Sequence, residues 1–247
     1  MMYLNVKNTL AALLIVFTFN HTMSAQELTD LNITDNLKIW SGLNLSYNVT
    51  NNVKLKMGQI FSLNTYPLEY SFSQTRLSLS FKIKRRTYIE GGFVKGFYHY
   101  SSYLENQGAS PGWFNTLAVD RVFGRFSYKH DLIARFSLNH KLEFQYFLPE
   151  LNKYKTRILY SVRLGYNVRR SSLTPYIRSR FYYYQGGAIL NNGIKRLRCT
   201  AGLSFRPAKN SSIRVSIYYL FQNELNTQQL SDNDYAVIGS SISFKLK

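Results

Sequence analysis

The chain has 247 residues and a formal net charge of +18, from 31 Lys and Arg against 13 Asp and Glu. Its one cysteine, Cys199, excludes an internal disulfide, so stability must come from burial and hydrogen bonds. A basic charge of this size usually indicates nucleic acid, anionic lipid or an anionic solute as the partner.

The first 25 residues have the layout of a secretory signal peptide. Lys7 gives a short positive start, residues 10–19 carry no charge, and small residues lead to a cleavage site after Ala25. The apolar run would form about 15 Å of helix, whereas a bilayer core needs about 30 Å, so an anchor is disfavoured. We expect residues 1–25 to be removed and 26–247 to form one domain. Export also makes nucleic acid a poor candidate partner.

From residue 37 onward, apolar and polar residues alternate with a period of two, which is typical of β-strands. In 196–205, apolar residues from Leu197 to Phe205 alternate with polar residues from Arg196 to Ser204. No segment of similar length shows a competing period of 3.6. In chain order, the clearest alternating segments are 37–48, 53–64, 76–83, 157–166, 196–205, 213–221 and 236–246.

The connections between these segments alternate in length, which predicts an up-and-down meander. Short connections fall at 48–52, 83–87, 167–172 and 206–211, and longer ones at 65–70, 101–113, 149–154, 185–193 and 222–234. Eleven strands are clear, and 114–147 contains no clean turn. Because single-chain bacterial barrels have an even number of strands, we predict twelve, with ten as the alternative. The twelfth would lie in 26–36 or in 114–147.

Strand length favours a transmembrane barrel over a soluble β-sandwich. Most of the alternating segments run for ten residues or more, whereas soluble strands average about five or six and a tilted membrane strand needs about nine to eleven. Closure leaves no backbone group unpaired in lipid. The chain has 20 Tyr and 17 Phe, and we expect those near strand ends to lie at the headgroup level. They are Tyr98, Tyr100, Tyr103, Trp113, Tyr182, Tyr183, Tyr184, Tyr218, Tyr219 and Phe221.

The chain resembles a known group of proteins in three hairpin segments, at 39–64, 72–97 and 137–147. It resembles a family of Gram-negative outer-membrane β-barrels catalogued as domain of unknown function 2490. The resemblance implies long strands, tight turns and inward arginines, but no established activity and no catalytic residues. One departure is the end of the chain, where Phe244 is followed by Lys245, Leu246 and Lys247. Barrels of this kind often end on an aromatic residue that the barrel-insertion machinery reads.

If the apolar face meets lipid, the polar face lines a lumen rich in arginine. The basic residues placed there by the alternation are Arg76, Arg157, Arg163, Arg178, Arg180, Arg196, Arg198 and Arg214. Glu90 and Glu143 join them, and Asp120 and Arg121 must lie on opposite faces because they are adjacent. Guanidinium groups bind phosphate and carboxylate through paired hydrogen bonds. The lumen is therefore either a narrow pore or binding site that prefers anions, or is packed shut by arginine, tyrosine and acidic side chains.

Catalysis and metal binding have little support in the sequence. A hydrolase needs a nucleophile, a base and an orienting group within hydrogen-bond reach. His99 precedes Ser101 and Ser102, and His130 precedes Asp131, but no GxSxG motif occurs. No CxxC or HExxH motif offers a metal site. We predict no enzyme activity, no metal and no cofactor, with a lipid hydrolase as a minor alternative.

The sequence therefore predicts an exported all-β barrel in the outer membrane of a Gram-negative bacterium. Short turns would face the periplasm and longer loops the outside. Its expected partners are outer-membrane lipid, the barrel-insertion machinery and small anionic solutes. An accessory barrel in a larger envelope complex is an alternative, with loops 101–113 and 222–234 as contacts. The glycines of 90–96 are interpreted as points of bending or close packing.

Overall fold

The structure is a computed structural model. It describes residues 37–65, 68–99, 116–132, 135–148, 155–186, 192–208, 211–225 and 234–246. These residues belong to one compact unit, Asn36–Lys247. The expected signal peptide and the possible strand at 26–36 lie outside the described residues.

The described residues form eleven β-strands, each 11 to 17 residues long. No helix in this part of the chain is long and apolar enough to cross a membrane. The strands are β1 (Leu37–Asn48), β2 (Val53–Thr65), β3 (Leu68–Lys84), β4 (Thr87–His99), β5 (Thr116–Asp131), β6 (Phe136–Phe147), β7 (Thr156–Tyr166), β8 (Thr174–Gln185), β9 (Gly193–Phe205), β10 (Ile213–Glu224) and β11 (Tyr235–Leu246).

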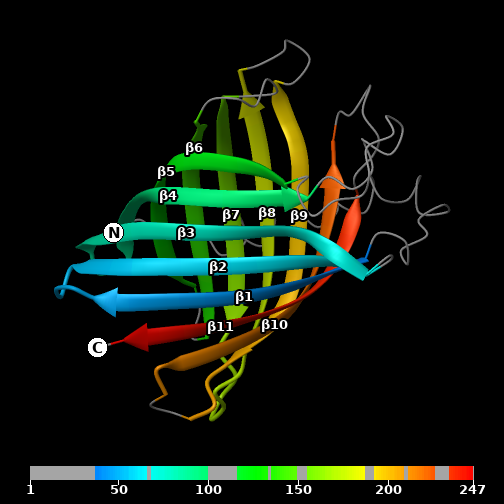
Figure 1. Ribbon diagram of the computed structural model, residues 1–247. Coiled ribbons are helices and arrows are strands. Elements are labelled where there is room, and N and C mark those ends of the chain that lie inside the picture. Colours follow the sequence, from blue (N-terminus) through cyan, green and yellow to red (C-terminus); the bar gives the residue numbers. More distant parts are fainter. Residues whose placement is uncertain are drawn as a thin grey trace, which may run out of the picture. The chain divides into compact units, whose positions relative to one another are not determined.

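The strands close into one barrel in which consecutive strands pair in antiparallel fashion (Figure 1). β1 and β11 complete the circle side by side in a parallel ladder from Leu37↔Ala236 to Tyr47↔Leu246. The predictions of twelve or ten strands and of a wholly antiparallel sheet therefore differ from what the described residues form. In a meander with an odd number of strands, the first and last run in the same direction, so their seam must be parallel. The parallel ladder still pairs the backbone groups on the facing edges of β1 and β11.

The connections alternate in length over only part of the barrel. At one end they have 4, 2, 4, 7 and 7 residues, and at the other 2, 16, 8, 7 and 10. The predicted longer connection at 65–70 is wrong, because β2 continues to Thr65 and β3 begins at Leu68. The predicted contrast between 167–172 and 185–193 is also wrong, because the connections after β7, β8 and β9 are equally long. The region 114–147 divides into β5 and β6, and a hydrogen bond from Leu132 N to Phe136 O at 3.0 Å closes their connection.

The two faces of the wall are reversed relative to a water-soluble protein. Large apolar side chains point outward, and Phe61, Phe144 and Ile217 are 51%, 54% and 56% exposed. Polar side chains such as Glu143 and Gln222 are buried on the inner face. The outer surface is therefore an apolar band around a polar interior.

The tyrosine clusters of the sequence are divided between these faces. Tyr182 and Tyr184 are buried inside the barrel, whereas Tyr183 lies outside and is 39% exposed. Tyr98 also lines the interior. The prediction that these residues form one headgroup belt is wrong for the inward rings, because neighbours on a strand face opposite ways. Tyr100, Tyr103 and Trp113 lie outside the described residues.

Close packing inside the wall depends on glycines. A Cβ at Gly239 would overlap the ring of Tyr218, and a Cβ at Gly92 would overlap the carbonyl oxygen of Leu77. Gly92 therefore requires glycine, because the obstacle is backbone, whereas at Gly239 the Tyr218 ring would have to shift. Gly92 fulfils the expectation of close packing in 90–96.

Candidate functional site: the barrel lumen

The barrel encloses a cavity of about 1830 Å³. Its wall includes Asn167 and Arg214 near the short turns, and Asn192 and Asp234 near the long loops. Residues from both ends of the barrel thus contribute to one cavity. The described strands leave a lumen that extends along the barrel rather than an isolated void.

The charge of this lumen is strongly positive in the part of the chain that the structure describes. Fifteen basic and four acidic residues line it. The basic residues are Lys38, Lys56, Arg76, Arg121, Arg125, Lys129, Lys141, Arg157, Arg163, Arg178, Arg180, Lys195, Arg196, Arg198 and Arg214, and the acidic residues are Glu90, Glu143, Glu224 and Asp234.

All eight arginines and both glutamates that the alternation placed on the inner face contact this cavity. The alternation did not decide which of Asp120 and Arg121 points inward. Arg121 lies on the inner face, while Asp120 forms a 3.6 Å ion pair with Lys95, and both side chains of that pair are substantially exposed. Sequence reasoning missed Arg125 because 114–147 could not be divided into strands. Lys38, Lys56 and Lys141 followed the same alternation and could have been found from it. Lys195 could not, because it lies beside the inward Arg196 at a register shift between β8 and β9.

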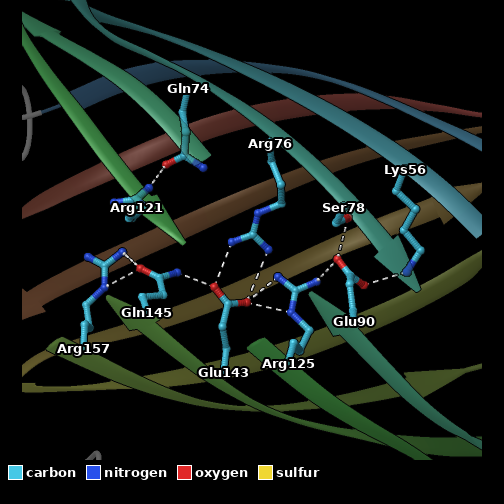
Figure 2. A network of polar contacts seen from close by, with 10 residues as sticks. All are labelled: Lys56, Gln74, Arg76, Ser78, Glu90, Arg121, Arg125, Glu143, Gln145 and Arg157. Carbon is cyan, nitrogen blue, oxygen red and sulfur yellow. Dashed lines mark hydrogen bonds and ion pairs between the residues drawn. The ribbon is translucent and has the colours of Figure 1, made fainter. Parts of the chain in front are cut away.

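Glu143 on β6 organises one side of the lumen (Figure 2). Its carboxylate accepts a hydrogen bond from Arg76 Nη2 at 2.8 Å and one from Arg125 Nε at 2.6 Å. Gln145 donates a further hydrogen bond to it. The carboxylate is only 6% exposed, so burial makes these charge-assisted bonds strong.

Glu90 on β4 forms a second centre, and Arg125 joins the two. Glu90 accepts hydrogen bonds from Lys56 Nζ at 2.6 Å, Ser78 Oγ at 3.0 Å and Arg125 Nη1 at 3.2 Å. Figure 2 shows the Arg125 guanidinium between the two carboxylates. The pairing is set by register, because Arg125 on β5 lies directly opposite both Glu90 and Glu143.

The same network extends through amides and aromatic rings. Arg157 Nε donates to Gln145 Oε1 at 3.0 Å, and Arg121 donates to Gln74. The Arg76 guanidinium lies 4.1 Å from the ring centroid of Phe123. We call this side of the lumen the paired wall, formed by Lys56, Gln74, Arg76, Ser78, Glu90, Arg121, Arg125, Glu143, Gln145 and Arg157.

Two more arginines on β9 have partners near the long loops. Arg196 Nε donates to Glu224 at 3.0 Å. Among the described residues, Arg198 forms no ion pair with a carboxylate, but it donates to Gln222 at 2.7 Å and to the hydroxyls of Tyr182 and Tyr235. Neutral oxygens therefore satisfy the Arg198 donors without neutralising its charge.

A third group has a different character, and we call it the cationic patch: Lys141 on β6, Arg163 on β7, and Arg178 and Arg180 on β8. Arg163 donates to Ser204 at 3.3 Å and lies over the Tyr176 ring at 3.9 Å. Arg180 hydrogen-bonds to Tyr182. Within the described ranges, none of the four forms an ion pair with a carboxylate within 4.0 Å.

The described histidines do not form a hydrolytic site. His140 Nδ1 lies 2.9 Å from the Tyr160 hydroxyl. The Asp131 carboxylate, beside His130 in sequence, instead binds Arg86 at 2.6 Å and Lys129 at 3.6 Å. Ser101, Ser102 and the side chain of His99 lie outside the described residues. Among the residues that are described, no group of three or more histidine, cysteine or acidic side chains is placed to hold a metal ion.

Comparison with known proteins adds little to this geometry. No family model matches the chain, and no curated protein matches it. Among the solved structures that match, one is titled "KdgM porin". It is 12% identical over 73% of this chain and 81% of that chain, with a TM-score of 0.40. The resemblance to the uncharacterised barrel family stays a prediction.

Proposed function

We propose that the chain is an outer-membrane β-barrel of a Gram-negative bacterium whose lumen is a narrow pore or binding site for anionic solutes. The observation that carries this proposal is the combination of an apolar outer surface with a lumen that fifteen basic and four acidic side chains of the described residues line.

The outer surface and strand length support placement in a membrane. The shortest strand has 11 residues, and a tilted strand needs about nine to eleven to cross. Outward residues such as Phe61 and Ile217 would be costly in water, but lipid accepts them. Closure through the parallel β1–β11 seam leaves no open sheet edge between the strands, which lipid requires.

The lumen charge supports a preference for anions. Charges that line a cavity with low-dielectric walls focus the electric field and raise the local concentration of the opposite ion. Cations outnumber acids by eleven among the described lining residues. Chloride, phosphate or carboxylate solutes would therefore be enriched inside, and cations depleted.

The test is the reversal potential of the full chain, expressed in a Gram-negative host and reconstituted in a planar bilayer under a KCl gradient. We expect channel currents that reverse near the chloride equilibrium potential. Arg178→Gln should move the reversal potential towards zero because it removes a lumen charge. Lys95→Gln is the matched control, since Lys95 carries the same charge outside the barrel, and it should leave the potential unchanged. A potential near that of potassium would contradict the anion preference.

The second candidate is a closed structural or accessory barrel in an envelope complex. The paired wall favours it, because Arg76, Arg125 and Glu143 form a network that fills lumen space. The cluster of Trp40, Leu220 and Val237 also occupies the inner face. A barrel that is folded by circular dichroism but electrically silent would favour this candidate over the pore.

A further inference from the structure

The cationic patch has a register that concentrates positive charge. Arg163 lies directly opposite Arg178 across β7 and β8. Ser161 lies opposite Lys141 on one side and Arg180 on the other, so the three form one row around the wall. Arg178 and Arg180 are two residues apart on the same strand and therefore share the inner face.

This arrangement is unfavourable unless something compensates it. Like charges directly opposite each other destabilise a sheet. The positive charges of Arg180 and Arg163 both act on Arg178, and those of Arg178 and Arg180 act on Lys141. Glu90 acts on Lys141 and Glu143 on Arg180, and each offsets part of this repulsion without an ion pair within 4.0 Å. On the paired wall, Glu90 and Glu143 offset the repulsion between neighbouring cations. Neither β7 nor β8 contains an acidic residue, so these two strands offer no such partner.

We propose that the cationic patch is a binding site for the phosphate group of a soluble solute, with Lys141, Arg163, Arg178 and Arg180 as its ligands and Ser161 as a further hydrogen-bond donor. The proposal rests on the proposed function and names the ligand class of the same lumen.

The chemistry of phosphate matches what the patch lacks. A phosphate dianion supplies two negative charges, where a carboxylate supplies one. Its tetrahedral oxygens accept hydrogen bonds from several directions, which suits donors from three strands. Guanidinium groups bind such oxygens through paired hydrogen bonds, and a lysine adds a point charge. The patch lines the lumen, so the phosphate belongs to a solute rather than to a lipid headgroup.

The first experiment is isothermal titration calorimetry of inorganic phosphate into the full chain in a maltoside detergent. At pH 8 and constant ionic strength, we expect saturable binding at one site. Arg178→Gln should weaken it about tenfold or more, because a hydrogen bond to a charged group is worth about 1.5–3 kcal/mol. Lys38→Gln removes the same charge from the lumen outside the patch, where its charged neighbours are Arg196, Arg198, Glu69 and Glu224, and should change the affinity less than about twofold.

A second variant adds the missing acid. Ser161→Asp places a carboxylate between Lys141 and Arg180, and we expect it to fold stably and to abolish phosphate binding. Absence of binding to the native chain would overturn the proposal, as would equal weakening by Arg178→Gln and Lys38→Gln. Acetate binding as tight as phosphate would also overturn it, because it would show no selection for the dianion.

Failure of this site and failure of the pore are separable. Reversal potentials of the same preparations report anion preference whether or not phosphate binds. Anion-selective current without phosphate binding would overturn the site alone. Phosphate binding to an electrically silent barrel would retain the site and reject the pore.

Discussion

The paired wall and the cationic patch use the same residue types on neighbouring strands, yet they differ in what surrounds each cation. On the paired wall, Arg125 bridges Glu90 and Glu143. In the patch, Arg178 faces Arg163 across the ladder and has Arg180 beside it. The difference arises from two inward acids, one on β4 and one on β6. Where an inward acid lies directly opposite an arginine, as Glu90 and Glu143 lie opposite Arg125, the arginine becomes part of the structure.

The comparison separates two uses of arginine in one lumen. Charges that are already neutralised by an ion pair have little attraction left for a solute, whereas charges without one retain more of it. We therefore expect stability to depend on the paired wall and solute preference to depend on the patch. Each of the following substitutions tests one part of that division.

The largest loss of stability should follow Glu143→Gln. The change keeps the shape of the side chain but removes the charge that pairs with Arg76 and Arg125. Breaking a buried ion pair by removing one partner costs about 3–5 kcal/mol. Because the two arginines are partly hydrated in the lumen, we expect about 3 kcal/mol or slightly less. Equilibrium urea unfolding in lipid vesicles measures the free energy of unfolding.

The matched control for that loss is Asp131→Asn, at an exposed ion pair. The carboxylate of Asp131 is 50% exposed and binds Arg86. An exposed pair contributes at most about 1 kcal/mol. Equal losses from Glu143→Gln and Asp131→Asn would show that burial inside the barrel does not strengthen the paired wall.

Added volume should also destabilise the side of the paired wall more than the side of the cationic patch. A methyl group added by Gly92→Ala meets the Leu77 carbonyl oxygen, whereas one added by Gly165→Ala reaches Ser137 Oγ at 3.5 Å, an ordinary contact. Overpacking costs about 1–3 kcal/mol, so we expect about 2 kcal/mol for Gly92→Ala and less than about 1 kcal/mol for Gly165→Ala. Urea unfolding again gives both values. The comparison fails if Gly165→Ala is the more damaging change.

Much of the fold could be read from the alternation of residues, because each position on a long strand has only two possible faces. That rule placed Arg178 and Arg198 inside and Leu203 outside. It could not assign faces where strands had no visible boundary, and Arg125 was missed for that reason. Whether the number of strands is odd or even could not be predicted either. The parallel pairing of β1 with β11 follows from closure of the barrel, and no residue pattern in either strand indicates it.

The division between the paired wall and the patch was not predictable from the sequence. Arg125 and Arg178 look alike in sequence, since each is an inward arginine with aromatic neighbours. What separates them is the residue opposite: Glu90 and Glu143 flank Arg125, while Arg163 and Thr200 flank Arg178. Those neighbours come from register, which positions far apart in the chain determine together.

The smallest effect on stability, and the one of opposite sign, should come from Arg178→Gln in phosphate-free buffer. Removing a cation that faces Arg163 relieves repulsion, and opposed like charges cost about 0.2–1 kcal/mol. We therefore expect the free energy of unfolding to stay level or rise by up to about 1 kcal/mol. The gain should shrink as salt rises from about 0.01 M to about 1 M, because the Debye length falls from about 30 Å to about 3 Å. Urea unfolding at both salt concentrations measures it, with Lys38→Gln as the control outside the patch. A loss comparable to that of Glu143→Gln would place Arg178 among the structural charges and remove the distinction between the two sides of the lumen.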